Sequence, residues 1–168
     1  MTVERTDPPY EADERATLLA FLDFQRDTLA WKCDGLDHEQ LRTRAVPPST
    51  LSLLGLVRHM SDVERGWFRG CLAGEDLKPR YWTDDDPDGD FDNVDTADVE
   101  ESFAIWRAEC ARAREIVATT PSLDVTGTRG NGDKVSLRWI VAHMIEEYAR
   151  HNGHADLLRE RIDGATGD

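Results

Sequence analysis

Residues 137–162 read LRWIVAHMIEEYARHNGHADLLRERI, and this stretch decides the fold class. Its inward-facing positions follow one another in alternating steps of four and three residues: Leu137, Val141, Met144, Tyr148, His151, Ala155 and Leu158. This spacing is typical of a helix that packs along one face inside a bundle. Ser136 is the predicted N-cap, and Gly164 follows the predicted end near Ile162.

Three earlier stretches carry comparable helical signals and predict helices over residues 11–33, 51–72 and 96–119, the last with Thr96 as N-cap. The second has apolar positions at Leu53, Leu56, Met60, Val63 and Trp67, and the third at Val99, Phe103, Trp106, Cys110, Ala113 and Val117. Four such helices predict an all-α four-helix bundle. The bundle is expected to be one domain over residues 1–168, with residues 1–10 flexible.

The connections between the helices carry weaker signals. A short helical turn is predicted over residues 37–43, and short extended pieces are predicted around Val125 and Val135. A loop is predicted over residues 74–95. Its acidic stretch 83–95 lacks the ordered ligand spacing and glycine of a calcium loop, so the loop is predicted to be a solvated connection in which Tyr81 and Trp82 can fold over a pocket.

Composition limits the partners. A net charge of −14, from 20 Lys and Arg against 34 Asp and Glu, argues against nucleic acid and anionic membranes. No apolar run approaches the roughly 20 residues of a membrane span, and the polar N-terminus is unlike a signal peptide, so a cytoplasmic location is expected. Cys33, Cys71 and Cys110 form no CxxC pair, which argues against a disulfide framework or a thiolate zinc site.

Polar residues at inward-facing positions are the candidate metal ligands. Glu147 and His151 lie one helical turn apart, about 6 Å along the axis, so both side chains can reach one ion. His59, at the border of the apolar face of residues 51–72, is the predicted third ligand. His143, Glu147 and His151 would together span about 12 Å, too far for one ion.

Other interpretations of these residues stay open at this point. A histidine on an apolar face is often a hydrogen-bonded core residue, and Arg58 or Arg150 can neutralise Glu147 in place of a metal. Gly153 sits inside the helix, where glycine costs about 1 kcal/mol relative to alanine, and predicts the close approach of another helix or a ligand.

Two segments carry a family resemblance. LVRHM at residues 56–60 and VAHMIEEYARHNGHADLLRERIDG at residues 141–164 resemble the DinB superfamily. The resemblance is strongest to the branch that contains the mycothiol S-transferases and the N-terminal domain of mycothiol-dependent maleylpyruvate isomerase. It implies a DinB-like bundle, often a homodimer, in which His59, Glu147 and His151 bind zinc or nickel. The isomerase has a further C-terminal domain, so isomerisation is not expected of a chain that ends at Asp168.

Nearby residues are candidates for supporting roles, and the resemblance also implies an activity. His154, His143 and Trp67 are expected to support the ligands or line the pocket, and His154 is also a candidate for an occasional fourth ligand. The expected function is a metal-dependent S-transferase that activates a low-molecular-weight thiol such as mycothiol toward a small-molecule electrophile. The alternatives are a metal-dependent hydrolase, which would activate water at the same site, and a non-catalytic bundle that binds a metal or small ligand.

Overall fold

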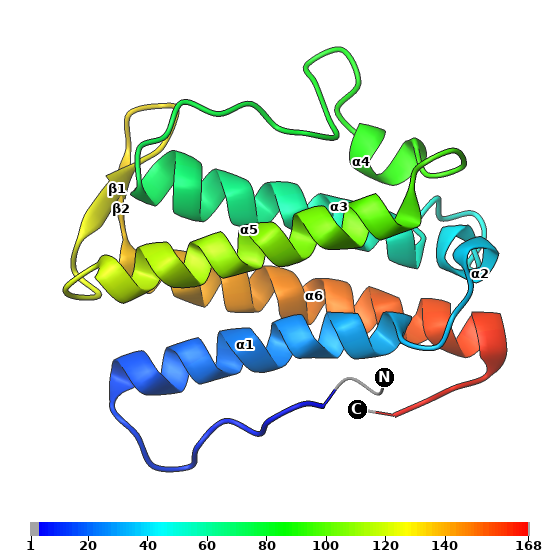
Figure 1. Cartoon of the computed structure of the whole chain (residues 1–168), viewed down its shortest axis with the longest axis horizontal. Coiled ribbons are helices and arrows are strands. Elements are labelled where there is room, and N and C mark those ends of the chain that lie inside the picture. The colour runs from blue at the N-terminus through cyan, green and yellow to red at the C-terminus, as the bar shows by residue number, and fades with distance from the viewer. Residues whose placement is uncertain (1–3, 168) are drawn as a thin grey trace.

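The computed structural model describes residues 4–167 and is mostly helical. The long helical elements are α1 (Glu14–Cys33), α3 (Leu53–Glu64) with its continuation η1 (Arg65–Leu72), α5 (Val99–Thr119) and α6 (Leu137–Asp163). They lie alongside one another, with α1 mainly against α6 and α3 mainly against α5 (Figure 1). The short elements are α2 (His38–Arg42), α4 (Gly89–Asp92), β1 (Thr126–Thr128) and β2 (Lys134–Ser136).

Side-chain caps fix where the long helices begin. Asp13 caps α1, which begins at Glu14, three residues after the predicted start at residue 11. Ser136 caps α6 as predicted by accepting a hydrogen bond from the Trp139 amide. The prediction that Thr96 caps the third long helix is wrong. Asp98 accepts from the Glu101 amide at 3.0 Å, so α5 begins at Val99.

The apolar residues that the spacing placed on the inner faces form the core. In α6 these residues are Leu137, Val141, Met144, Tyr148, Ala155 and Leu158, and in α5 the six predicted positions are likewise buried. No helix in residues 4–167 is long and apolar enough to cross a membrane. Cys33, Cys71 and Cys110 are buried and unpaired.

A buried polar cluster joins the long helices at their centre. Glu64, at the end of α3, is fully buried, and its carboxylate accepts two hydrogen bonds of 2.7 Å from Arg26 of α1. It also accepts from the Tyr148 hydroxyl of α6 at 2.8 Å. Tyr148 in turn accepts from the indole of Trp106 of α5 at 2.9 Å. The buried charges are therefore paired and hydrogen-bonded, as buried charges require.

The second long helix departs from the prediction of a continuous α-helix to Leu72. From Arg65 onward it becomes the π-helix η1, whose hydrogen bonds span five residues, as from the Ala73 amide to the Phe68 carbonyl at 3.0 Å. The wider turn shifts which side chains face the core. Phe68 is fully buried, whereas Trp67, predicted on the inner face, is half-buried.

The connection between η1 and α5 was predicted to be solvated, and this is wrong for part of it. Gly89 and Asp90 are buried, and Arg58 donates to both of their carbonyls at 3.2 and 3.1 Å. The Asp62 carboxylate accepts from the backbone amides of Arg80 and Tyr81 at 2.8 and 2.9 Å. Two neighbouring turns of α3 thus hold residues 80–90 against the helices.

The strands β1 and β2 pair antiparallel, with Gly127 opposite Val135, where short extended pieces were predicted. The hairpin packs against the end of η1. A Cβ atom at Gly127 would lie 2.3 Å from the Cys71 carbonyl oxygen and 2.7 Å from the Leu72 Cα. Only glycine allows this approach, which sets the position of the turn 129–132 beside η1.

Candidate metal centre and adjoining cleft

The fold brings together the three residues predicted as metal ligands. His59 comes from α3, and Glu147 and His151 come from α6; each offers a ligand atom within 4.8 Å of the others. The His59 and His151 rings meet edge to face with centroids 4.7 Å apart, and Glu147 Oε2 lies 3.6 Å from His151 Nε2. Two imidazoles and one carboxylate are a donor set that holds zinc and other first-row divalent ions.

Asp90 is a further residue of this site that the sequence analysis did not identify. Asp90 is 3% exposed, and its Oδ2 lies 2.7 Å from His59 Nδ1. Its Oδ1 accepts from the Phe91 amide at 3.0 Å, and the Phe91 ring stacks on His59 with centroids 4.7 Å apart. A carboxylate accepts the Nδ1 proton, so His59 keeps its Nε2 lone pair for a ligand.

His151 is held in the form that binds metals. Burial, followed by the neighbouring His59, His154 and Arg150, lowers its pKa to about 3. A neutral imidazole is the ligating species, because a protonated ring has no free lone pair. His154 Nδ1 lies 3.3 Å from His151 Nδ1, which leaves His151 Nε2 on the side of Glu147.

His143 lies one turn before Glu147, at the edge of the site. Its Nδ1 is 2.9 Å from Glu146 Oε2, and its ring stacks on Trp139 and meets the edge of Trp67. His143, Glu146 and Glu147 form a second group whose ligand atoms lie within 4.8 Å of one another. This second group comes from α6 alone and includes the exposed Glu146, so it is the more open of the two.

The structure does not support two other interpretations of the sequence, which concern the partner of Glu147 and the role of Gly153. Arg58 is engaged with the carbonyls of Gly89 and Asp90, and within residues 4–167 neither Arg58 nor Arg150 forms an ion pair with Glu147. The expectation that Gly153 marks the close approach of another helix is wrong, because a Cβ atom there would meet nothing within 4 Å.

A cleft of about 860 Å³ adjoins the site at His59. One wall is the face of α3 and η1 that carries Val63, Gly66, Trp67, Gly70 and Cys71. The facing wall is segment 75–91, which contributes Trp82 as predicted, and the hairpin turn closes the far end with residues 128–130. Of the three candidate ligands, His59 lines this groove, which is large enough for a drug-sized molecule.

The comparisons agree with this chemistry. The family model described as mycothiol-S-transferase matches residues 17–164, which include His59, Asp90, Glu147 and His151. No curated protein gives a significant match to the chain. Because the match covers nearly the whole sequence, the chain belongs to the mycothiol S-transferase family.

Proposed function

We propose that this protein is a divalent-metal-dependent mycothiol S-transferase whose metal is held by His59, Glu147 and His151. The observation that carries the proposal is the convergence of these three side chains from α3 and α6 within 4.8 Å. Their number supports a catalytic site, since three protein ligands leave a coordination position for a substrate. The ion is zinc in this proposal, with nickel as the alternative, because imidazole and carboxylate ligands suit both.

We further propose that the four long helices form a DinB-like four-helix bundle. The side-by-side arrangement of α1, α3, α5 and α6 supports this assignment, as does the origin of the ligands on facing helices (Figure 1). A homodimer and a cytoplasmic location remain predictions, and sedimentation analysis of the purified protein tests the dimer.

The chain's own residues would prepare the site for thiol chemistry. When bound, a divalent ion would keep a thiol deprotonated at neutral pH. Asp90 holds His59 by its Nδ1–H, and His154 contacts the inner nitrogen of His151, so both rings present Nε2 to the same point. Phe91 covers one face of His59 and restricts water there. The thiolate sulfur would then form a bond to an electrophilic carbon of the second substrate, which would release a leaving group as its anion or, at an activated double bond, take up a proton from water.

Removal of each ligand tests the proposal. His59→Ala, Glu147→Ala and His151→Ala are expected to lose the metal, and to lower the rate of mycothiol conjugation to a fluorogenic electrophile by at least about 10-fold, since even supporting residues have effects of this size. Elemental analysis gives metal per chain. His38→Ala is the control, because His38 is an exposed histidine of α2.

Three outcomes would contradict the proposal in different ways. Full metal retention in all three ligand variants would refute the ligand assignment. A rate that does not saturate with added thiol would indicate the metal-dependent hydrolase. Metal binding without turnover of any thiol would indicate a non-catalytic binding protein.

A further inference from the structure

The cleft beside His59 is larger than a cysteine-sized thiol needs. It runs from His59 along α3 and η1 to the hairpin turn, with a volume of about 860 Å³, near the upper end of the roughly 300–1,000 Å³ of small-molecule pockets. Mycothiol carries its cysteine on an uncharged, hydroxyl-rich glucosamine–inositol unit. The question is therefore whether the groove is built for that unit.

Two glycines of η1 leave the helix backbone without side chains on the wall of the cleft. Gly66 and Gly70 lie one above the other on the lining face of η1. A Cβ atom at Gly66 would meet nothing within 4 Å, and one at Gly70 would meet only the Arg65 carbonyl at 3.8 Å. Glycine inside a helix costs about 1 kcal/mol relative to alanine. Neither glycine is required by a neighbouring protein atom, so the space that both leave is available to a ligand.

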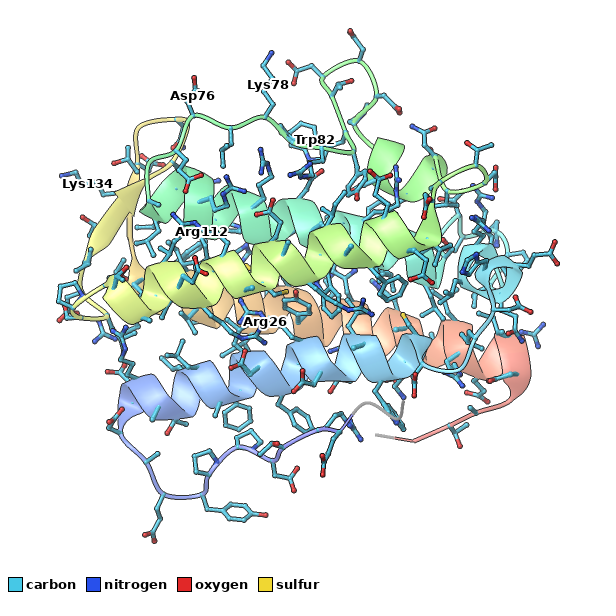
Figure 2. All side chains as sticks on the ribbon, in the orientation of Figure 1. Arg26, Asp76, Lys78, Trp82, Arg112 and Lys134 are labelled. Carbon is cyan, nitrogen blue, oxygen red and sulfur yellow. The ribbon has the colours of Figure 1, made fainter. Side chains whose placement is uncertain are left out.

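Aromatic faces line the groove. Trp82 is 37% exposed and belongs to segment 75–91, while Trp67 comes from η1. An indole offers a flat apolar face together with one N–H donor, which suits the alternating C–H and O–H surface of a sugar ring. Figure 2 shows Trp82 on segment 75–91, whose Asp76 and Lys78 side chains point away from the helices.

The charged groups around the groove are of both signs. Arg129 lies over Trp67, 5.4 Å from its ring centroid, and forms no ion pair within the described chain. Its guanidinium therefore has donors free for hydroxyl groups. A groove built for an anion or a cation would gather one sign of charge. This one carries Arg65 and Arg129 together with Asp62, Glu75, Asp88 and Asp90, while the side chains of Asp76 and Lys78 point outward at its rim.

We infer that this cleft binds the glucosamine–inositol part of mycothiol and places the cysteine thiol at the His59 end. The inference rests on the proposed function for the position of the thiol. It assigns Gly66, Gly70, Trp67, Trp82 and Arg129 to recognition of the thiol carrier. The residues therefore determine which thiol is used, and they do not take part in the chemistry.

The decisive variant is Gly66→Leu, which fills the groove from a helical position with free space and replaces glycine by a better helix former. Calorimetry with metal-loaded protein is expected to show mycothiol binding weakened by about 10-fold or more. Metal content and the rate with N-acetylcysteine, which has the thiol without the sugar, are expected to be unchanged, and the thermal stability is expected not to fall. Trp82→Ala is expected to act in the same direction.

Gly153→Leu is the matched control, because Gly153 is an exposed helical glycine with nothing within 4 Å and lies outside the cleft. Unchanged mycothiol binding in Gly66→Leu would overturn the inference. An equal loss of rate with mycothiol and N-acetylcysteine would also overturn it, because the groove would then hold the electrophile. A third outcome is that mycothiol binds, that Gly66→Leu weakens this binding, and that no conjugation occurs. This outcome would refute the transferase activity but would support the assignment of the cleft to mycothiol.

Discussion

A single hydrogen bond determines how His59 is presented. The imidazole can point either nitrogen toward Glu147 and His151, and Asp90 decides between them by taking the Nδ1 proton at 2.7 Å. The carboxylate cannot turn easily, since the Phe91 amide binds its other oxygen and Arg58 holds the Asp90 carbonyl. The orientation of His59 is therefore fixed before any ligand arrives.

The Asp90→Asn substitution tests this role. The amide has nearly the shape of the carboxylate but carries no charge, so His59 is held less firmly as an Nδ1–H tautomer. Zinc affinity, measured by competition with a chromophoric chelator, is expected to fall by about 10- to 100-fold, the usual size of such effects. A cobalt-substituted sample should show an altered visible absorption spectrum.

Asp62→Asn is the matched control for Asp90→Asn. Asp62 is also a buried carboxylate that anchors the same segment, through the amides of Arg80 and Tyr81, and the structure gives it no contact with the His59 ring. An equal loss of zinc affinity in both variants would show that Asp90 only anchors the segment.

The sequence was sufficient to predict the three side chains that the fold brings together, but not Asp90. Helical spacing makes Glu147, His151 and His59 candidates, because it relates position in the sequence to direction, and the family resemblance selects them from the other histidines. Asp90 lies among many acidic residues in a segment without periodicity. Its position depends on how Arg58 and Asp62 fold that segment back, which no local pattern indicates.

At the scale of elements, the π-helix η1 and the β1–β2 hairpin shape the far end of the cleft. The apolar spacing continues through Val63 and Trp67, so no sequence pattern predicts a change of helix type at Arg65. Gly66 and Gly70 weaken the α-helix there, but glycine alone does not identify a π-helix. The strands were predictable because turn residues lie between two short β-prone pieces.

The close contact between the β1–β2 hairpin and η1 predicts that a side chain at Gly127 destabilises the protein. Gly127→Ala is expected to lower the free energy of unfolding by about 1–3 kcal/mol, because its methyl group would overlap backbone atoms of Cys71 and Leu72 that cannot rotate away. Urea denaturation measures the change. Gly130→Ala, in the same hairpin with nothing within 4 Å, is expected to be within about 0.5 kcal/mol of the parent. Similar values for both would disprove the tight contact.

At the scale of the whole molecule, the Glu64 cluster ties α1, α3, α5 and α6 together at one point. Figure 2 shows Arg26 pointing from α1 toward the centre of the molecule. The mostly helical fold was predictable from the apolar spacing, since hydrophobic burial depends on which face each residue occupies. The Glu64 cluster was not predictable from the sequence. A glutamate and an arginine are the same letters whether their side chains are exposed to solvent or buried against each other.

Breaking this cluster is expected to affect the global stability strongly. Arg26→Met leaves Glu64 buried without its cation and is expected to lower the free energy of unfolding by about 3–5 kcal/mol. The double variant Arg26→Met with Glu64→Leu is expected to recover much of that loss, since no charge is then left buried. Chemical denaturation followed by tryptophan fluorescence measures both.

Arg112→Met serves as the surface comparison for Arg26→Met, because Arg112 pairs with exposed Glu115 and is itself about half exposed. It is expected to change the stability by less than about 1 kcal/mol. Additive losses in the double variant of Arg26 and Glu64 would contradict the pairing.

The anchoring of residues 80–90 on α3 also limits how the protein can diversify. Arg58, His59 and Asp62 occupy adjacent turns, and each of them holds this one segment. A deletion or graft that alters the segment at positions 80, 81, 89 or 90 would disturb a proposed metal ligand as well as the groove. New substrate preferences are therefore expected to arise by exchange at the segment's exposed tip, residues 83–88, or in the hairpin turn. The exposed tip and the hairpin turn can vary in length without changing the contacts that Arg58, His59 and Asp62 make with residues 80–90.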